Sequence, residues 1–508
     1  MTSNGKPGHS SSDGSDGSGG GTSSSSRRTF LAAGSASTSA LLAGCFSGTG
    51  GDGGDGGSSG DGGSDGGSDG GSGDGASGGT TGSAGSETVE LVWWHQENVP
   101  HRIDVFEELN QKFMDEHPNI EVRQEPQTWG GVYAKLQSAL SSGNEPDFWF
   151  NTPVLAQEFH GRGHLADVSD IMDELDSEYS YYDKTVQQYN YDGGQWGIPN
   201  WNKGFMYFYR TDTFGDLDWP PQNWQQWLDG MSQVTDPGND QYGYVMAASN
   251  THFAYKQVYQ MLSLKDAYVF GPDGKIMFDT ENTVQMLDFY KQLWNQTVPD
   301  SAVNWSWPEW SRALRQGTSH STTSYTAPIV AMDDPSRWKP MSQPMTVPAP
   351  AESGSWGAGS RARWVSIDGV SVFNEEKKDA ITKYMKFIHR PDVYGWWMRT
   401  LNPTLFVPVH EAGWNADVYW EGAHANQPMK QMVEIQHSLE DMAYPGFRDI
   451  HMENDTYVGQ GIGVIEGNFP LGSIVNQLIG QDKSPETVAE WGQSHLEEVT
   501  GIGASSEL

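Results

Sequence analysis

The strongest constraint on the fold is a break in composition near residue 86. All 21 tryptophans of the 508-residue chain lie at or beyond Trp93, whereas the preceding segment consists mainly of Gly, Ser and Asp. A segment with few large apolar side chains buries too little surface to offset the entropy lost on ordering. The folded part is therefore expected to begin at Glu87, and its roughly 420 residues suffice for two or more hydrophobic cores.

The first 45 residues carry the pattern of an export signal. Arg27 and Arg28 precede an apolar, small-residue stretch, Phe30 to Ala43, which leads directly to Cys45. This stretch is long enough for a signal sequence and too short to span a bilayer. The arginine pair resembles the twin-arginine signal of proteins that fold before export. Leu42-Ala43-Gly44-Cys45 resembles a lipobox, in which the cysteine is lipidated. A chance arginine pair beside an apolar run is the alternative.

These features predict a lipid-anchored protein on the extracellular face of the cytoplasmic membrane. Residues 1–45 are expected to form the twin-arginine lipoprotein signal, with Cys45 as the anchor. Residues 46–86 are expected to form a disordered Gly/Ser/Asp tether, whose mean reach is about 35 Å for a flexible chain of that length. Cys45 is the only cysteine, which excludes a disulfide framework and any metal site with two thiolates.

The charge balance narrows the possible partners. The chain has 66 acidic and 30 basic residues, a net charge of −36. Such a negative field argues against binding to nucleic acid or to anionic lipid. It is typical of proteins from high-salt environments, where ions screen self-repulsion, so we expect a halophilic archaeal origin. An ordinary acidic secreted protein is the alternative. The 14 histidines show no metal-ligand spacing, so neither a metal nor another cofactor is expected.

The start of the folded part alternates between strand and helix patterns. Strands are expected at residues 89–94, 120–123 and 148–150, and helices at 101–117 and 132–142. This order, with short links, predicts an α/β fold with a parallel sheet. Ligands of such sheets bind beyond the carboxyl ends of the strands. That position is held by His95, Gln96, Glu97 and Asn151.

Several segments, in order, resemble one family. They are the lipobox, "FMDEHPNIEV", "KLQSALSSGNEPDFWF", Gly197-Ile198-Pro199 followed by Met206 to Asp212, "GVSVFNEEKKDAITKYMKFIHRPDVYGWWM" and "FVPVH". Together they resemble the family-1 extracellular solute-binding proteins, the maltose-binding-like group of sugar ABC transporters. The resemblance covers nearly all of residues 87–508.

The resemblance implies a periplasmic-binding-protein-like α/β fold. Its two lobes have mixed, mostly parallel sheets, a hinge joins them, and the ligand cleft lies between them. Lobe one would comprise residues 87–200 plus 343–400, and lobe two residues 201–342 plus 401–508. Tyr325 and Phe447 correspond to ligand-contacting positions of the family. The chain departs from the maltose-binding pattern at residues 96–98 and 327–329, so maltodextrin itself is not expected.

A sugar presents apolar ring faces and a rim of hydroxyl groups, so its site needs aromatic faces together with carboxylates and amides. Several tryptophans stand in polar, loop-like contexts, and burial in the core is the competing interpretation for each. The candidates from this pattern are Trp129, Trp201, Asn202, Trp305, Trp307, Trp364 and Asp368. Trp149, Trp224, Trp227, Trp396 and Trp397 are expected to pack in the interior.

These observations predict a monomeric binding protein, not an enzyme, that delivers a sugar or oligosaccharide to the permease subunits of an ABC importer. The chain lacks the phosphate-binding loop of an ATPase, the H-E-x-x-H pattern and the G-x-S-x-G pattern. Two alternatives stay open. One is a secreted carbohydrate-active enzyme, because carboxylates are plentiful. The other is a binding protein for a polyamine, a peptide or a metal chelate.

Overall fold

The computed structural model describes residues 88–506, except for 218, 220, 222, 266, 326–337, 341–363, 403–404, 423–429, 431–432, 435–436, 438–443 and 446–460. The described residues all belong to one compact unit, Gly82–Leu508. Arg27, Arg28, Cys45 and the expected tether lie outside the described residues, as does Phe447.

The described chain alternates between helices and strands in the α/β manner. The strands are β1 (Val89–His95), β2 (Ile120–Pro126), β3 (Phe148–Asn151), β4 (Asn190–Tyr191), β5 (Gly194–Gln195), β6 (Ile198–Arg210), β7 (Ser321–Tyr325), β8 (Trp338–Pro340), β9 (Trp364–Val372) and β10 (Tyr444–Pro445). The α-helices are α1 (Pro100–Glu116), α2 (Val132–Ser142), α3 (Pro153–Gly161), α4 (Ser169–Tyr179), α5 (Asp183–Val186), α6 (Thr211–Phe214), α7 (Trp224–Gln233), α8 (His252–Leu264), α9 (Glu281–Thr297), α10 (Trp307–Arg315), α12 (Lys378–Ile388), α13 (Pro391–Leu401), α14 (Glu411–Trp414), α16 (Ile462–Asn468), α17 (Pro470–Val475) and α18 (Pro485–Thr500). The short helical turns are η1 (Pro237–Asn239), η2 (Asp300–Asn304), η4 (Glu375–Lys377), η5 (Asp417–Trp420) and η9 (Asn476–Gly480).

One mixed sheet runs through the unit in the order β2-β1-β3-β9-β6-β7, with β10 beside β9 and β8 beside β6. β1 pairs in parallel with β2 and β3, as the alternating sequence pattern predicts. β9 is antiparallel to both β3 and β6. The chain passes along the sheet on β6 and returns on β9, so these two neighbours run in opposite directions.

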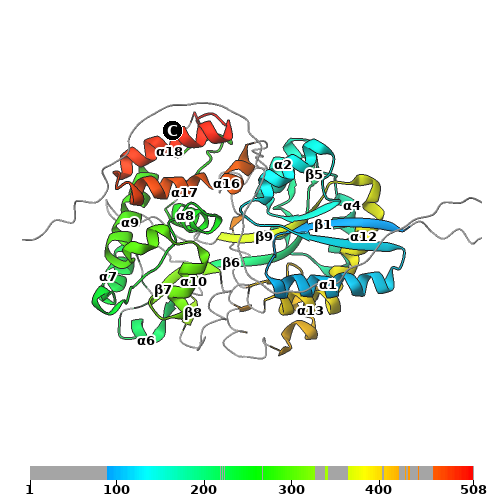
Figure 1. The fold of residues 1–508 in the computed structure, drawn as a ribbon, viewed down its shortest axis with the longest axis horizontal. Helices are drawn as coiled ribbons and strands as arrows, with labels where there is room; N and C mark the ends of the chain where they lie inside the picture. The colour runs from blue at the N-terminus through cyan, green and yellow to red at the C-terminus, as the bar shows by residue number, and fades with distance from the viewer. Residues whose placement is uncertain are drawn as a thin grey trace, which may run out of the picture. The chain divides into compact units, whose positions relative to one another are not determined.

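Strand β6 is long enough to pair with different strands along its two halves. Its first residues pair with β9, from Ile198 opposite Val370 to Phe205 opposite Trp364. Its last residues pair with β7 and β8. Figure 1 shows β6 and β9 passing between two groups of helices, one around β1 and one around β7. The expected lobe boundaries near residues 200 and 400 stay a prediction.

The helices form two groups around this sheet. α1, α12 and α13 pack together, and α1 and α12 contact β2 and β1. α8, α9, α17 and α18 form the second group. Helices α2 and α3 also belong to the first group, because their apolar residues pack with Trp94 of β1 and Trp149 of β3. The short helix α16 contacts α2 and α3 of the first group and α17 and α18 of the second. It therefore lies where the two groups meet.

Apolar periodicity explains why these helices form. Phe106, Leu109 and Phe113 of α1 lie on one face of that helix and are fully buried. Pro100 occupies the first turn of α1, where its missing N–H group costs nothing. Gly143 ends α2 with a φ of 67°, a left-handed conformation that glycine adopts without strain.

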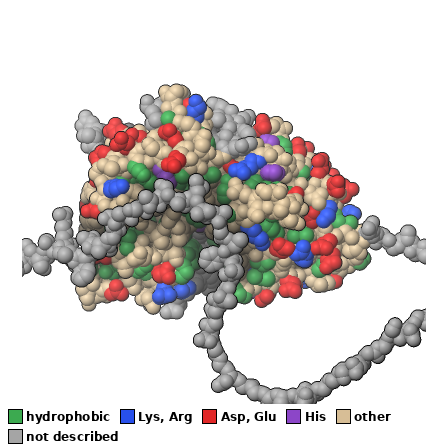
Figure 2. All heavy atoms as spheres, turned by 45° about the horizontal axis from the view of Figure 1, so that its top comes forward, with side chains coloured by type: hydrophobic (Ala, Val, Ile, Leu, Met, Phe, Trp, Pro, Cys, Tyr) green, Lys and Arg blue, Asp and Glu red, His purple; other side chains and the backbone are tan. Residues whose placement is uncertain are grey.

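The expected packing tryptophans lie in the interior. Trp149, Trp224, Trp227 and Trp397 are 0% exposed, and Trp396 is partly buried against the apolar cluster that includes Trp397. The two helices and three strands expected between residues 89 and 150 are all present, and β2 extends three residues beyond its expected end. No helix within the described residues is long and apolar enough to cross a membrane. On the surface, acidic side chains are spread over the face drawn in Figure 2.

Candidate functional site

The loop that follows β1 is buried although it is polar. His95, Gln96 and Glu97 are 0%, 3% and 4% exposed. The His95 Nε2 atom lies 2.9 Å from Gln124 Oε1, and Gln124 Nε2 donates to the Ile103 carbonyl. Burial lowers the pKa of His95 to about 4, so its imidazole is neutral at pH 7. The Nε2 atom then carries the proton, and Nδ1 is an acceptor.

Glu97 begins a chain of buried charges. It forms an ion pair with Arg102 of α1, and its carboxylate also interacts electrostatically with Lys203 of β6. Burial by itself would raise the pKa of Glu97, but the two cations outweigh burial and hold that pKa below its ordinary value. Glu97 therefore stays ionised inside the protein.

The crossing strands supply the next pair of charges. Lys203 on β6 and Asp368 on β9 form an ion pair and are 6% and 2% exposed. Trp201 lies opposite Asp368 in the sheet, and its Nε1–H donates to Asp368 Oδ2 at 3.0 Å. Burial raises the pKa of Asp368, and Lys203 opposes this shift. A charge held in the middle of a sheet needs such partners, because an unpaired buried ion is costly.

A second group of polar side chains surrounds Glu466 of α16. This carboxylate accepts hydrogen bonds from Lys256 Nζ at 3.1 Å and from the Thr152 hydroxyl, and His252 Nε2 lies at 3.4 Å. Burial would raise the pKa of Glu466, but Lys256 and His252 lower it well below its ordinary value. Burial and the adjacent Lys256 lower the pKa of His252 to about 4.

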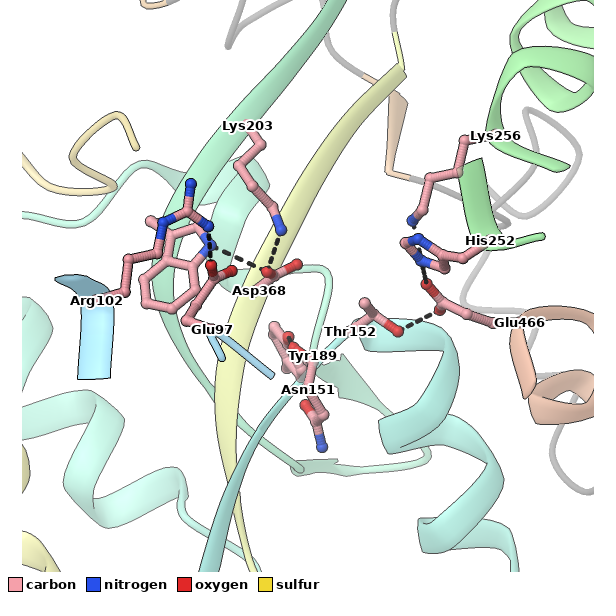
Figure 3. A network of polar contacts seen from close by, with 11 residues as sticks. Glu97, Arg102, Asn151, Thr152, Tyr189, Lys203, His252, Lys256, Asp368 and Glu466 are labelled. Atoms are coloured by element: carbon pink, nitrogen blue, oxygen red, sulfur yellow. Dashed lines mark hydrogen bonds and ion pairs between the residues drawn. The ribbon is translucent and has the colours of Figure 1, made fainter. Parts of the chain in front are cut away.

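The two groups of charges belong to one network. Burial lowers the pKa of Lys256, and the positive charge of Lys203 lowers this pKa further, whereas Glu466 and Asp368 act on it in the opposite direction. Figure 3 shows the Glu97 and Asp368 pairs on one side and the Glu466 group on the other, with Tyr189 and Asn151 between them in this view. Residues from β1, β3, β6, β9, α1, α8 and α16 thus meet in one buried polar region.

An indole ring joins the two halves of this network. Trp129, which lies just before α2, stacks on the His252 imidazole with 4.9 Å between ring centres and 21° between planes. The Lys203 ammonium group lies 5.1 Å from the centre of the same indole. Both contacts use the electron-rich ring of Trp129.

Several buried hydrogen-bonding atoms near this network have no partner among the described residues. Asn151 ends β3, is 0% exposed, and neither its Oδ1 nor its Nδ2 atom is paired. Four further buried side-chain atoms are also unpaired: Oδ1 and Nδ2 of Asn200, Nε2 of Gln96 and Nδ1 of His95. Buried polar groups in proteins are normally satisfied, so unpaired groups call for an explanation such as a bound polar molecule. Donors and acceptors are both present, which matches the hydrogen bonding of hydroxyl groups.

The structure brings together many of the residues expected at the site. His95, Glu97, Trp129, Trp201 and Asp368 contact the charge network directly. Gln96 lies between His95 and Glu97 in the same buried loop, and Asn151 is drawn between the two groups of charges in the view of Figure 3. Asn202 is buried, and its backbone pairs with Val407.

Other expected residues lie elsewhere or show only their backbone position. Trp305 and Trp307 are partly buried against the core, and Trp307 packs on Phe253 and Trp310, outside the charge network. Tyr325 lies at the end of β7, and Trp364 at the start of β9. Phe447 lies outside the described residues.

Five members of the network were not predicted from the sequence: Arg102, Lys203, His252, Lys256 and Glu466. Two of them carried a usable signal. Lys256 is the only Lys, Arg, Asp or Glu in α8, and Glu466 is the only one in α16 and α17. When a helix that packs in a core carries a single charged residue, that residue needs an oppositely charged partner, because an unpaired buried charge is costly. No group of three or more metal-ligating side chains occurs within the described part of the chain.

Comparison with known proteins places this architecture in a class. T. maritima MalE3 with maltose bound has a TM-score of 0.64 at 16% identity, over 81% of this chain and 100% of that one. A sugar transporter protein from Arthrobacter chlorophenolicus A6, solved with laminaribiose, has a TM-score of 0.65 at 13% identity, over 81% of this chain and 99% of that one. The fold is therefore that of the periplasmic binding proteins, with two α/β lobes, and the predicted fold class is confirmed. The expectation of mostly parallel pairing is wrong for the described sheet: β9 is antiparallel to β3 and β6, and β6 is antiparallel to β7 and β8, because the chain crosses on β6 and returns on β9.

The family follows from the sequence match. The family model described as bacterial extracellular solute-binding protein matches residues 108–412, and the chain belongs to this family. A relative, the putative ABC transporter periplasmic-binding protein YcjN of Escherichia coli (strain K12), is 24% identical over 339 residues, 64% of this chain and 74% of that protein.

Proposed function

We propose that this protein captures a sugar or short oligosaccharide outside the cell and delivers it to the permease of an ABC importer, without chemical turnover. Family membership supports the binding role. The solved structures of similar fold contain maltose, laminaribiose and, in the Agrobacterium radiobacter K84 protein, ribitol. The E. coli relative, an ABC transporter binding protein by name, supports the transport role.

The observation that carries this proposal is the set of unpaired buried atoms beside ionised groups and an indole. Gln96, Asn151 and His95 hold unpaired donors and acceptors near the carboxyl ends of β1 and β3. Hydroxyl groups of a sugar both donate and accept, and carboxylates strengthen such bonds. We assign ligand contacts to the predicted set, with the best support for those near the network: His95, Gln96, Glu97, Trp129, Asn151, Trp201, Asn202 and Asp368.

We also propose how the protein reaches its ligand. Residues 1–45 would direct export by the twin-arginine route, Cys45 would carry the lipid anchor, and residues 46–86 would tether the folded part at the membrane. The net charge of −36 supports a halophilic origin. Lobe one would comprise residues 87–200 plus 343–400, and lobe two residues 201–342 plus 401–508. The monomer would close its lobes on the sugar and present the closed form to the permease.

A ligand panel in concentrated KCl tests the proposal. Maltose, laminaribiose, ribitol, spermidine and a tripeptide are added to the protein, and the unfolding temperature is measured. A neutral sugar or polyol is expected to raise the unfolding temperature by mass action, because it binds only the folded state. A shift with spermidine or the peptide alone would overturn the sugar assignment. New reducing ends after incubation with the oligosaccharides would show turnover and refute a pure binding role.

A further inference from the structure

The contact between α3 and α16 has features that packing alone does not require. α3 follows β3, whereas α16 lies 300 residues later and packs with α17 and α18. Gly461, at the start of α16, fits tightly against α18, because a Cβ atom there would lie 2.3 Å from the Thr500 carbonyl oxygen. Glu466 ties the same helix to Lys256 of α8. α16 is therefore fixed to the second group of helices.

A buried carboxylate of α3 holds the beginning of α16. Glu158 has a side chain that is 0% exposed, and its Oε2 atom accepts hydrogen bonds from the backbone N–H groups of Gly461 at 2.6 Å and Gly463 at 3.1 Å. These N–H groups have no partner within a helix, and they carry the positive end of its dipole. Arg162 forms an ion pair with the other oxygen of Glu158, and its positive charge compensates the charge of the buried carboxylate.

Glycine permits this close contact. A Cβ atom at Gly463 would lie 2.6 Å from the Glu158 Cγ atom, and one at Gly467 would lie 2.5 Å from the Tyr133 ring. No side chain fits at these two positions while α16 rests on α2 and α3. Tyr133 in turn contacts Glu158 Oε1 and the Arg162 guanidinium group, both at 3.3 Å. The backbone of α16 and the Glu158 carboxylate are thus complementary in shape and in charge.

Two further contacts join the same helix groups beside the network. Thr152, the N-cap of α3, donates to Glu466 of α16, and Trp129 stacks on His252 at the start of α8. Like the Glu158 contact, these two contacts join the two groups of helices. Their residues in the first group precede α4 in the chain, and their residues in the second group follow β6. In an open form every one of these polar groups would exchange its protein partner for water.

We infer that Glu158 and the amides of Gly461 and Gly463 form a latch that favours the closed form of the protein before any ligand binds. The inference rests on the proposed function only in that the latch acts on the same cleft. A latch of this kind raises the population of the binding-competent form, and the apparent affinity for ligand rises in proportion. Loss of the latch lowers both quantities together.

The test measures the separation of the two helix groups in the full-length chain without ligand. In a Cys45→Ser background, nitroxide labels are placed at Ser141→Cys on α2 and Glu490→Cys on α18, both exposed positions. Double electron–electron resonance is expected to show mainly the short, closed distance. Glu158→Gln removes the charge and is expected to lower the closed population about tenfold, so that the long distance dominates, and to weaken binding of whichever panel sugar binds by the same factor.

Glu174→Gln is the matched control, because Glu174 pairs with Lys386 on an exposed part of α4. It is expected to leave both readouts unchanged. An unchanged distance distribution in Glu158→Gln would overturn the latch even if sugar binds. A shifted distribution with no binding of any sugar would keep the latch and refute the proposed ligand, so the two failures are distinct.

Two further measurements cover a folding defect in Glu158→Gln, which circular dichroism would reveal. Gly463→Ala keeps every charge and should open the structure in the same way by steric conflict. In the unsubstituted chain without ligand, hydrogen–deuterium exchange at Gly461 and Gly463 should be slow, because the closed form already protects these amides. Exchange at the rate of unprotected amides would contradict the latch.

Discussion

The buried ion pair between Lys203 and Asp368 dominates the energetics at the level of single residues. Both residues lie in the sheet, and their side chains are 8% and 2% exposed. Such a pair does not stabilise a fold strongly compared with apolar residues of the same shape, but removal of one partner leaves an uncompensated charge. The pair therefore makes this position intolerant of single substitutions, and the hydrogen bond from Trp201 fixes the carboxylate orientation.

Substitution of Asp368 tests this view. Asp368→Asn is expected to lower the free energy of unfolding by about 3 to 5 kcal/mol, because the buried ion pair between Lys203 and Asp368 is lost in the interior. Asp212→Asn is the control, since Asp212 forms an exposed pair with Arg210 and should cost less than about 1 kcal/mol. Urea unfolding in high salt measures both. Equal effects of the two substitutions would contradict a critical role for the buried pair.

Buried histidines make the stability depend on pH. Burial lowers the pKa of His389 from 6.5 to about 3, and His410 beside it is shifted in the same direction. Between these pH values the unfolded chain binds a proton that the folded chain does not. The stabilisation of the fold by neutral, buried His389 is therefore fully present above pH 6.5, and it is lost as the pH falls toward 3.

The expected result is a lower unfolding temperature at pH 4.5 than at pH 7, with a weaker dependence in His389→Gln. The shift of His389 corresponds to about 3 to 5 kcal/mol across the whole range. His101→Gln, at an exposed position on α1, serves as the control and should retain the full dependence. Parallel pH profiles for the parent chain and His389→Gln would refute this assignment.

At the level of elements, β9 is the strand on which the sheet depends. It lies between β3 and β6, and Gly369 is paired with both Asn151 and Pro199. A Cβ atom at Gly369 would lie 2.6 Å from the Ile198 carbonyl oxygen and 2.7 Å from the Tyr189 ring. The tight fit keeps β6 and β9 close at the start of their pairing, next to the register shift between Pro199 and Trp201.

Gly369→Ala is expected to destabilise the protein by about 1 to 3 kcal/mol, the usual range for an added group in a full interior. Gly130→Ala provides the comparison, because a Cβ atom at Gly130 meets nothing within 4 Å. Chemical unfolding of the two variants measures the difference. A Gly369→Ala protein as stable as Gly130→Ala would mean that the strands can separate slightly without loss.

The sequence predicted the elements that have strong local patterns and missed partners that are distant in the chain. The apolar faces of α1 and α2 and the short runs of β1 and β3 were sufficient to place those elements. Trp149, Trp224 and Trp227 were also recognised as interior residues. By contrast, Lys256 and Glu466 are 210 positions apart, and only the tertiary fold brings them together. Trp201 was predicted to contact ligand from its polar neighbours, and this contact stays a prediction. The tertiary fold adds what the neighbours could not indicate: the Trp201 ring packs against Phe150 and Phe406, and its Nε1–H donates to Asp368.

At the level of the whole molecule, the net charge sets the conditions under which the fold is stable. A charge of −36 creates strong self-repulsion in dilute buffer. The Debye length falls from about 10 Å at 0.1 M salt to about 3 Å at 1 M, so most of this repulsion disappears in concentrated salt. The ion pairs on the surface are weakened by the same screening, but they are individually small.

The unfolding temperature is therefore expected to rise by at least about 10 °C between 0.1 M and 2 M KCl, as self-repulsion is screened. Thermal unfolding followed by circular dichroism measures this shift. Sucrose, which is excluded from the protein surface but does not screen charge, should have a smaller effect. An unfolding temperature that is independent of KCl would argue against adaptation to high salt.

The position of β9 also has a consequence for biosynthesis. A ribosome that has released residues only up to Tyr325 has produced β3 and β6 but not the strand that separates them. The nascent chain then presents two strand edges with unsatisfied backbone groups, which are prone to pair with other chains. Synthesis must continue through Val372 before these edges are covered. Completion of the sheet is thus a late event in synthesis. If the chain crosses the membrane already folded, the sheet must be completed before export, in the compartment where the ribosome translates the chain.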